Sequence, residues 1–211
     1  MKLYNTTGAP NPRRVRIFMA EKGIDCEKVE INIVKGENLS AEFLGVNPRG
    51  MLPTLVLDDG TVIDETVAIC RYLEESNPEP PLMGTDAVSK AQIESRQRHM
   101  EWDGLIPAME AFRNSFPGFA KRGLGGSVGE VPAIEALVDR GRTMLSRFYS
   151  HLNEHLAQHQ FIAAEVFSIA DITALCTIDF STGAARVSIP DELTHLKRWH
   201  SETSARPSAK A

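Results

Sequence analysis

The chain has 211 residues, of which 42% are hydrophobic, and its 23 basic and 28 acidic side chains give a formal net charge of −5. This length and apolar content predict one large or two small globular domains with a buried core, and the acidic balance argues against a nucleic-acid partner. Residues 1–10 lack the apolar core of a secretion signal and nowhere do 18 apolar residues run together, so we expect no membrane span.

The three cysteines, Cys26, Cys70 and Cys176, are far apart in the chain. An odd number of cysteines is a poor disulfide framework, and these lack the spacing of a metal site, so a reducing cytoplasm is the expected location. The six histidines show helical spacing at positions 151, 155 and 159, which we expect to face solvent. The sequence therefore predicts no metal site.

The first 75 residues alternate strand and helix signals. Strands are expected at residues 2–5, 28–34, 54–57 and 61–63, and helices at residues 15–23 and 66–76. The third and fourth strands flank Asp58, Asp59 and Gly60, a sequence typical of a hairpin connection. The predicted order is βαβ followed by ββα.

Residues 76–86 are a predicted linker, because prolines and a glycine interrupt a polar segment, and the remainder of the chain reads as helical. A first long helix is expected from about residue 87 to residue 113 with a bend near Pro107, then a glycine-rich loop over residues 114–130. Apolar residues then repeat at helical spacing from Ile134 to Leu156, and the polar tail is expected to fray.

The segment FSIADI (167–172) predicts a sharply defined helix start. Ser168 is placed as the N-cap, and Asp171 stands three residues later, where its carboxylate can complete a capping box. We therefore interpret Asp171 as a structural residue, although an isolated acid at this position can be mistaken for a catalytic one.

One proline looks misplaced. Pro53 has no backbone N–H to give a sheet, yet it stands directly before the strand-like run TLVL. Its surroundings, NPRGMLPTLVLDDGTVIDETVAICRYLEES (47–76), together with FSIADI, resemble the cytosolic glutathione transferases, in particular bacterial members of the theta, delta and zeta kind. The resemblance implies a thioredoxin-like α/β domain over residues 1–75 (βαβ-ββα), a linker over 76–86 and an all-α domain over 87–211.

The resemblance also implies a glutathione site in the first domain. Pro53 is expected to follow a cis peptide bond, so that the backbone of Leu52, beside Met51, pairs with the cysteinyl backbone of glutathione. Glu65 and Thr66, at the start of a helix, would bind the γ-glutamyl end, and Asn38 the glycyl carboxylate. Three alternatives remain: an ordinary edge-strand proline at Pro53, an N-cap at Thr66 and a solvated loop amide at Asn38.

The reaction needs the glutathione sulfur as a thiolate, which a hydrogen-bond donor of the protein can stabilise. This thiolate donor is less evident, because Ala9 stands where related enzymes have a catalytic serine. The nearest donors are Thr6, Thr7 and Asn11. Asn11 and Thr7 are the candidates for the thiolate donor, and backbone N–H groups are the alternative. Asn11 before Pro12 also predicts a helix N-cap. Tyr4 is interpreted as core or cleft wall, and the absence of cysteine from residues 4–16 argues against a mixed disulfide with glutathione.

The resemblance implies an enzyme that conjugates glutathione to a small hydrophobic electrophile. Glutathione is the co-substrate, no other cofactor is expected, and the enzyme is expected to be a homodimer. The residues that could line the acceptor site are Met100, Trp102, Asp103, Ile106, Pro107 and Phe112, although for each one alone the helical periodicity favours a core position. Two alternatives remain open. One is a glutathione-dependent isomerase, although the SSC motif common in such isomerases is absent. The other is a non-catalytic carrier of glutathione or of a hydrophobic ligand.

Overall fold

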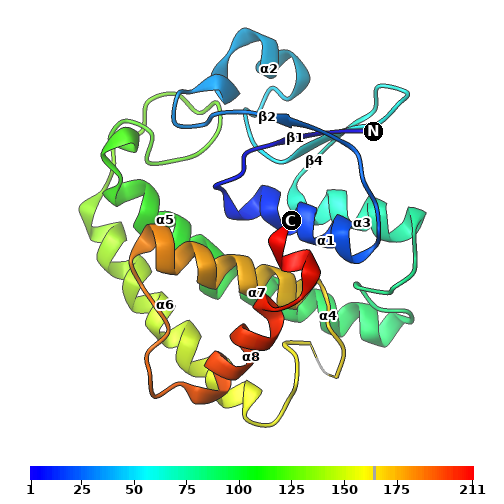
Figure 1. Ribbon diagram of the computed structural model, residues 1–211. Coiled ribbons are helices and arrows are strands. Elements are labelled where there is room, and N and C mark those ends of the chain that lie inside the picture. Colours follow the sequence, from blue (N-terminus) through cyan, green and yellow to red (C-terminus); the bar gives the residue numbers. More distant parts are fainter. Residues whose placement is uncertain (164) are drawn as a thin grey trace.

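Four short strands build a mixed sheet in the N-terminal part of the chain (Figure 1). This computed structural model describes residues 1–163 and 165–211. The strands are β1 (Lys2–Asn5), β2 (Glu27–Glu30), β3 (Thr54–Val56) and β4 (Val62–Asp64), in the order β2-β1-β3-β4. β1 runs parallel to β2 and antiparallel to β3, with Leu3 opposite Leu55, and β3 runs antiparallel to β4.

Three helices accompany the sheet. α1 (Pro10–Glu21) and α3 (Thr66–Ser76) lie on the sheet face that is turned toward the helical part of the chain, and α2 (Ala41–Val46) lies beyond the opposite face (Figure 1). The βαβ-ββα order is confirmed. β2 ends at Glu30, earlier than expected, and α2 was not predicted; it begins because the Ser40 hydroxyl accepts the Phe43 N–H at 3.2 Å and Phe43 is buried.

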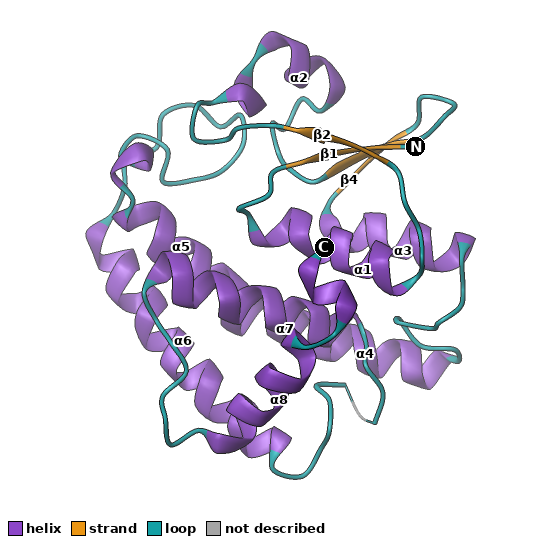
Figure 2. Ribbon diagram, viewed as in Figure 1, coloured by secondary structure: helices purple, strands orange, loops and turns teal. Residues whose placement is uncertain are grey.

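The C-terminal part is helical, as predicted (Figure 2). Its α-helices are α4 (Ala87–His99), α5 (Ile106–Ser115), α6 (Glu135–Leu156), α7 (Ile169–Phe180) and α8 (Thr194–Ser204). The buried face of α6, which includes Leu145, Phe148 and Leu152, matches the periodic pattern of the sequence. No helix in the described ranges is both long and apolar enough to cross a membrane.

The irregularity in the first long helix lies before Pro107 and not at it. Residues Met100–Leu105 form a π-helical turn between α4 and α5. Since Pro107 has no N–H for an upstream carbonyl, a widened turn before it lets the helix continue. Gly104 permits this close packing, because a Cβ at that position would lie 2.6 Å from the Phe148 ring.

The capping box at the start of α7 is confirmed. The Ser168 hydroxyl accepts the Ala170 N–H at 3.3 Å, and the Asp171 carboxylate accepts the Ser168 N–H at 3.0 Å. Asp171 also accepts the Ile162 N–H and the Trp199 indole N–H, each at 3.0 Å. Complete burial raises the pKa of Asp171 to about 6, and its bonds tie three segments together, in keeping with a structural role.

The C-terminal tail is ordered against α1, so the expectation of fraying was wrong. Pro207–Lys210 form a 3-10 turn in which Ser208 and Ala209 are buried. Arg206 makes two hydrogen bonds to the carboxylate of Glu21, at 2.7 and 2.8 Å, and Arg13 donates to the Ala209 carbonyl at 3.0 Å. The polar tail residues find their partners on α1, beside which Figure 1 draws the C-terminus, and local composition does not reveal such distant partners.

Candidate functional site

A cavity of about 400 Å³ lies between the sheet-containing part and the helical part. Three segments of the first part contribute to its wall, namely the turn from β1 into α1, residues 30–39 and residues 50–52, and α5 with the loop after it closes the other side. Of the expected site residues, Asn11, Asn38, Met51 and Leu52 line the cavity. The structure therefore brings together side chains from both parts of the chain.

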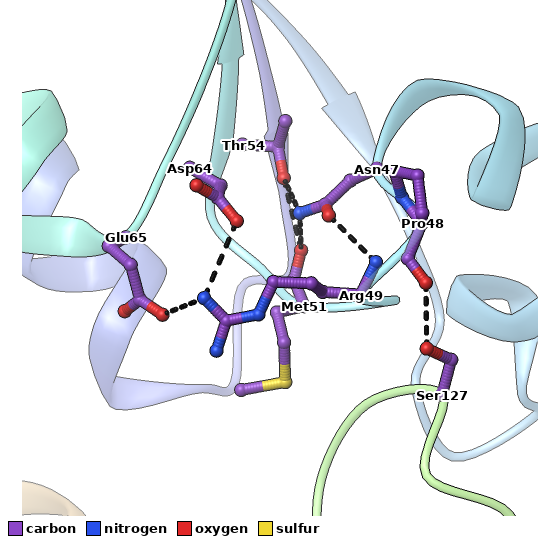
Figure 3. A network of polar contacts seen from close by, with 8 residues as sticks. All are labelled: Asn47, Pro48, Arg49, Met51, Thr54, Asp64, Glu65 and Ser127. Carbon is purple, nitrogen blue, oxygen red and sulfur yellow. Dashed lines mark hydrogen bonds and ion pairs between the residues drawn. The ribbon is translucent and has the colours of Figure 1, made fainter.

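The loop before β3 has the predicted form. The Leu52–Pro53 peptide bond is cis, and Asn47 holds the loop through its Nδ2, which donates to the Met51 carbonyl at 3.2 Å and the Thr54 hydroxyl at 2.9 Å (Figure 3). No hydrogen bond of the Leu52 backbone occurs within residues 1–163 and 165–211. Leu52 therefore presents an N–H and a C=O next to the cavity, where an extended peptide ligand can pair with them.

Glu65 and Thr66 begin α3 but do not line the cavity. Glu65 is the N-cap, with φ of 69°, and Thr66 is the first helical residue, so Thr66 is not the N-cap. Arg49 reaches toward Glu65 and Asp64, with Nη1 2.7 Å from the Glu65 carboxylate and 3.7 Å from that of Asp64 (Figure 3). Thr66 is buried. The exposed Glu65 carboxylate thus lies outside the residues that line the cavity, and it is paired with Arg49 of the loop before β3.

A loop of the helical domain covers the residue 48–50 segment, which the sequence did not predict. The Ser127 hydroxyl donates to the Pro48 carbonyl at 2.7 Å (Figure 3). The Ser127 N–H also donates to the Arg49 carbonyl, at 2.9 Å. Gly126 makes this approach possible, because it has φ of +81° and a Cβ there would lie 2.6 Å from the Arg49 carbonyl oxygen. The glycine-rich composition of residues 114–130 was the available signal.

Asn38 is 8% exposed, so the alternative of a solvated amide was wrong. Its Nδ2 donates to the Gly50 carbonyl at 2.8 Å, and its Oδ1 is buried without a partner among the described residues. The amide therefore holds the residue 50–52 segment in place through the carbonyl of Gly50. Binding of a glycyl carboxylate by Asn38 remains a prediction.

Asn11 is the second residue of α1, and Ala9 is the N-cap, so the predicted capping role of Asn11 was wrong. Pro10 occupies the first helical position, where a missing N–H has no consequence, and it starts the helix two residues earlier than Pro12 would. The Asn11 Oδ1 accepts from Arg14 Nη1 at 2.9 Å, and its Nδ2 has no protein acceptor in the described part of the chain. Asn11 lines the cavity next to Ala9.

Arg14 determines the orientation of the Asn11 amide. A guanidinium only donates hydrogen bonds, so the oxygen of Asn11 must face Arg14 and its NH₂ group must point elsewhere. Arg14 is 1% exposed, and its Nη2 donates to Glu101 Oε1 at 2.7 Å across the boundary with the helical domain. Glu101 in turn accepts from Arg98 at 2.9 Å. The sequence did not reveal this series of hydrogen bonds, since Arg14 and Glu101 are 87 residues apart.

Thr7 is less favourably placed than its neighbour Thr6. Thr7 is exposed and lies at a second, shallower cavity, with its backbone N–H donating to Glu30 at 2.6 Å. Thr6 is buried and lines the main cavity. Tyr4 packs against Phe43, with ring centroids 5.5 Å apart, which fits the interpretation as a core residue.

Of the expected acceptor-site residues, only Phe112 lines the cavity. Met100 and Pro107 are buried, and Trp102 is 63% exposed to solvent. The apolar wall is instead built from Phe112, Phe119, Phe180 and Met109. These side chains come together from α5, the following loop and α7, so helical periodicity alone could not separate them from core residues.

The cysteines are not placed for thiol chemistry. Burial raises the pKa of Cys70 and of Cys176 to about 12, and partial burial raises that of Cys26, so all three remain thiols at neutral pH. In the described ranges, no three His, Cys, Asp or Glu residues are grouped to hold a metal ion.

The chain matches two family models, one described as glutathione S-transferase, N-terminal domain, over residues 9–76, and one as glutathione S-transferase, C-terminal domain, over residues 107–207. Glutathione S-transferase 2 of Saccharomyces cerevisiae is 33% identical over 213 residues, covering 100% of this chain and 88% of the yeast protein. A maleylacetoacetate isomerase of Pseudomonas aeruginosa is 36% identical over 94 residues, covering 44% of each protein.

Solved structures agree with this relationship. A glutathione S-transferase domain-containing protein of Marinobacter aquaeolei is 33% identical with a TM-score of 0.89, and the match covers 99% of both chains. Gtt2 of Saccharomyces cerevisiae is 31% identical with a TM-score of 0.89, covering 100% of this chain and 99% of the yeast chain. The relationship therefore extends over both parts of the fold.

Proposed function

This chain belongs to the glutathione S-transferase family and is a glutathione transferase, and we propose that its cavity joins the sulfur of glutathione to a small hydrophobic electrophile. The thiolate forms a C–S bond to the electrophilic carbon, the leaving group departs with the electron pair of its bond to that carbon, and the thiol proton goes to solvent. The cavity wall of Phe112, Phe119 and Phe180 supports an apolar acceptor.

The observation that carries the proposal is the NH₂ group of Asn11 at the cavity, which has no acceptor among the residues that the structure describes. Lowering a thiol pKa from about 8.5 to about 7 needs roughly 2 kcal/mol of preferential thiolate stabilisation. One hydrogen bond to a charged group supplies about 1.5–3 kcal/mol. Asn11 is therefore a sufficient thiolate donor although Ala9 has no hydroxyl, and Thr7, which lies outside the main cavity, is the weaker candidate.

Glutathione is proposed to lie along the residue 51–53 segment, with its cysteinyl backbone on Leu52 beside Met51 and Pro53. The backbone of Leu52, which forms no hydrogen bond within the described ranges, supports this placement. We propose Glu65 and Thr66 for the γ-glutamyl end, where the Glu65 carboxylate suits an ammonium group. Asn38 is retained as a candidate near the glycyl end because it lines the cavity.

Further properties are proposed with the function. The domain division is 1–75, 76–86 as linker and 87–211, and the active form is a homodimer located in the cytoplasm and serving detoxification. Exposed Val62 on the edge strand β4 and exposed Val88 on α4 support a dimer contact, and three free cysteines support a reducing compartment.

The test is conjugation of glutathione to 1-chloro-2,4-dinitrobenzene by the natural protein and by Asn11→Ala. We expect conjugation by the natural protein and a large loss of rate with retained glutathione binding in the variant. Glutathione binding without a conjugation rate above buffer, across a panel of electrophiles, contradicts the proposal and favours a carrier. Turnover confined to cis-trans isomerisation favours the isomerase alternative, for which the matched relative covers less than half of this chain.

A further inference from the structure

Two arginines flank one phenylalanine ring at the cavity wall. Arg113 of α5 and Arg122 of the following loop both line the cavity, with their guanidinium carbons 4.5 and 4.8 Å from the centroid of the Phe119 ring. Both distances are within the range of cation–π contacts. The aromatic ring thus holds two positive charges beside a largely apolar cavity.

Neither arginine forms an ion pair within the described residues. Arginines elsewhere in this part of the chain make most of its ion pairs. Burial, with Arg122 as a second cause, lowers the pKa of Arg113. The lining residue Glu30 forms no ion pair with either arginine within the described residues, and its carboxylate instead accepts from Asn5 and from the Thr7 N–H at 2.6 Å each. Two partly desolvated cations therefore lack an anion, an arrangement that a bound carboxylate would neutralise.

The Arg113 guanidinium also has unused donors. Its Nη2 donates to the carbonyls of Arg122 and Leu124 at 2.8 and 2.7 Å, which fixes the position of the group. Its Nε is buried without an acceptor, and Nη1 has none in the part of the chain that the structure describes. A charged group held in place with free N–H donors is suited to receive a ligand oxygen.

The guanidinium lies close to the predicted glutathione segment. Gly125 separates the two, since a Cβ at this glycine would lie 3.5 Å from Met51 Sδ and 3.8 Å from Arg113 Cζ. Met51 directly precedes Leu52, the proposed partner of the cysteinyl backbone. A ligand bound there is therefore within reach of Arg113.

We propose that Arg113, supported by Arg122, forms a carboxylate subsite of the cavity. This proposal rests on the transferase function above and deepens it, because it assigns a charged group to the bound ligand. The carboxylate has two possible sources with the same chemistry: the glycyl end of glutathione, or an acidic electrophile. Such an electrophile would carry its carboxylate on the far side of an apolar body that packs against Phe112 and Phe180.

The test compares two ligand pairs that differ in one charge. The first pair is glutathione and its glycyl ethyl ester, measured by calorimetry. The second is 4-chloro-3,5-dinitrobenzoate and its methyl ester, measured as conjugation rates. Each pair is measured with the natural protein, Arg113→Gln, Arg113→Lys and the control Arg147→Gln, which removes an exposed arginine of α6.

We expect Arg113→Gln to weaken the charged member of one pair at least tenfold relative to its ester, a difference of about 1.4 kcal/mol, with Arg113→Lys retaining part of the preference. Selective loss in the first pair assigns the carboxylate to glutathione, and selective loss in the second assigns it to the acceptor. Because each ester is an internal reference, a general disturbance of the loop cancels within the pair.

Equal changes for both members of both pairs overturn the subsite. A natural protein without conjugation of either acceptor contradicts the transferase proposal instead. In that case, calorimetric affinities for the S-aryl glutathione conjugates of the second pair replace the rates, since binding needs no turnover, and the same comparison decides the subsite.

Discussion

Replacing Asn11 by alanine should raise the thiol pKa of bound glutathione. The variant removes a side-chain amide that lines the cavity beside Ala9 and whose NH₂ group has no acceptor among the described residues, while Arg14 and Glu101 keep their own bond at 2.7 Å. Asn11 is on the first turn of α1 and packs no apolar core, so the fold should tolerate the change.

The magnitude follows from the kind of bond that is lost. A hydrogen bond to a charged sulfur is worth about 1.5–3 kcal/mol, and one pKa unit corresponds to about 1.4 kcal/mol, so the thiol pKa should rise by roughly one to two units. At a pH below both thiol pKa values the conjugation rate should fall roughly 10- to 100-fold. At alkaline pH, where both forms are thiolate, the rates should converge.

The assay is an ultraviolet titration of the thiolate in the complex, with the pH dependence of kcat/KM for 1-chloro-2,4-dinitrobenzene as a second measurement. Asn11→Asp should raise the pKa further, because a carboxylate repels the thiolate. Thr7→Ala distinguishes the remaining candidate. A thiol pKa that is unchanged in Asn11→Ala but raised in Thr7→Ala would refute the reasoning.

Two more predictions concern stability and a third concerns glutathione binding. Arg14→Met should lower the free energy of unfolding by about 1.5–3 kcal/mol in urea titration, because it removes a buried charged hydrogen bond to Glu101, which keeps only Arg98 as its partner, and a loss below about 1 kcal/mol would contradict this. Asp171→Asn tests the raised pKa of Asp171, which is near 3.8 in the unfolded chain and about 6 in the folded protein. As the pH rises from 4 to 6, the free energy of unfolding of the natural protein should fall by up to about 3 kcal/mol relative to that of the variant, because the unfolded carboxyl loses its proton first. A difference that stays constant with pH would argue against this shift. Gly126→Ala should weaken glutathione binding, measured by calorimetry, more than the control Gly129→Ala. Both glycines have a positive φ near 80°, but a Cβ at Gly126 would lie 2.6 Å from the Arg49 carbonyl oxygen and a Cβ at Gly129 would have no atom within 4 Å. Equal effects of the two substitutions would exclude the Arg49 contact as the cause.

The sequence predicted the fold well because its signals are local. The βαβ-ββα order depends on alternation and on a hairpin connection, and the start of α7 depends on Ser168 and Asp171, three residues apart. The ordered tail was missed for the opposite reason. Its stabilising partners, Glu21 and Arg13, lie at the other end of the chain.

The candidate site was predicted only in part. The motif around Pro53 identified the loop beside the cavity, because a proline before a strand is an anomaly that local reading detects. Asn11 lies at the cavity as expected, but the bond that orients its amide was not predicted, since the Arg14–Glu101 contact that fixes Arg14 joins two domains. Arg113 and the loop around Ser127 were missed because neither position is unusual until the chain folds back over residues 48–51.

A crystal structure of the protein with glutathione tests the central claim most directly. The account predicts the cysteinyl backbone paired with Leu52 and the sulfur within hydrogen-bonding distance of Asn11 Nδ2, with Asn11 Oδ1 still facing Arg14. A sulfur that contacts the hydroxyl of Thr6 or Thr7, and leaves the Asn11 amide without a ligand, would contradict it.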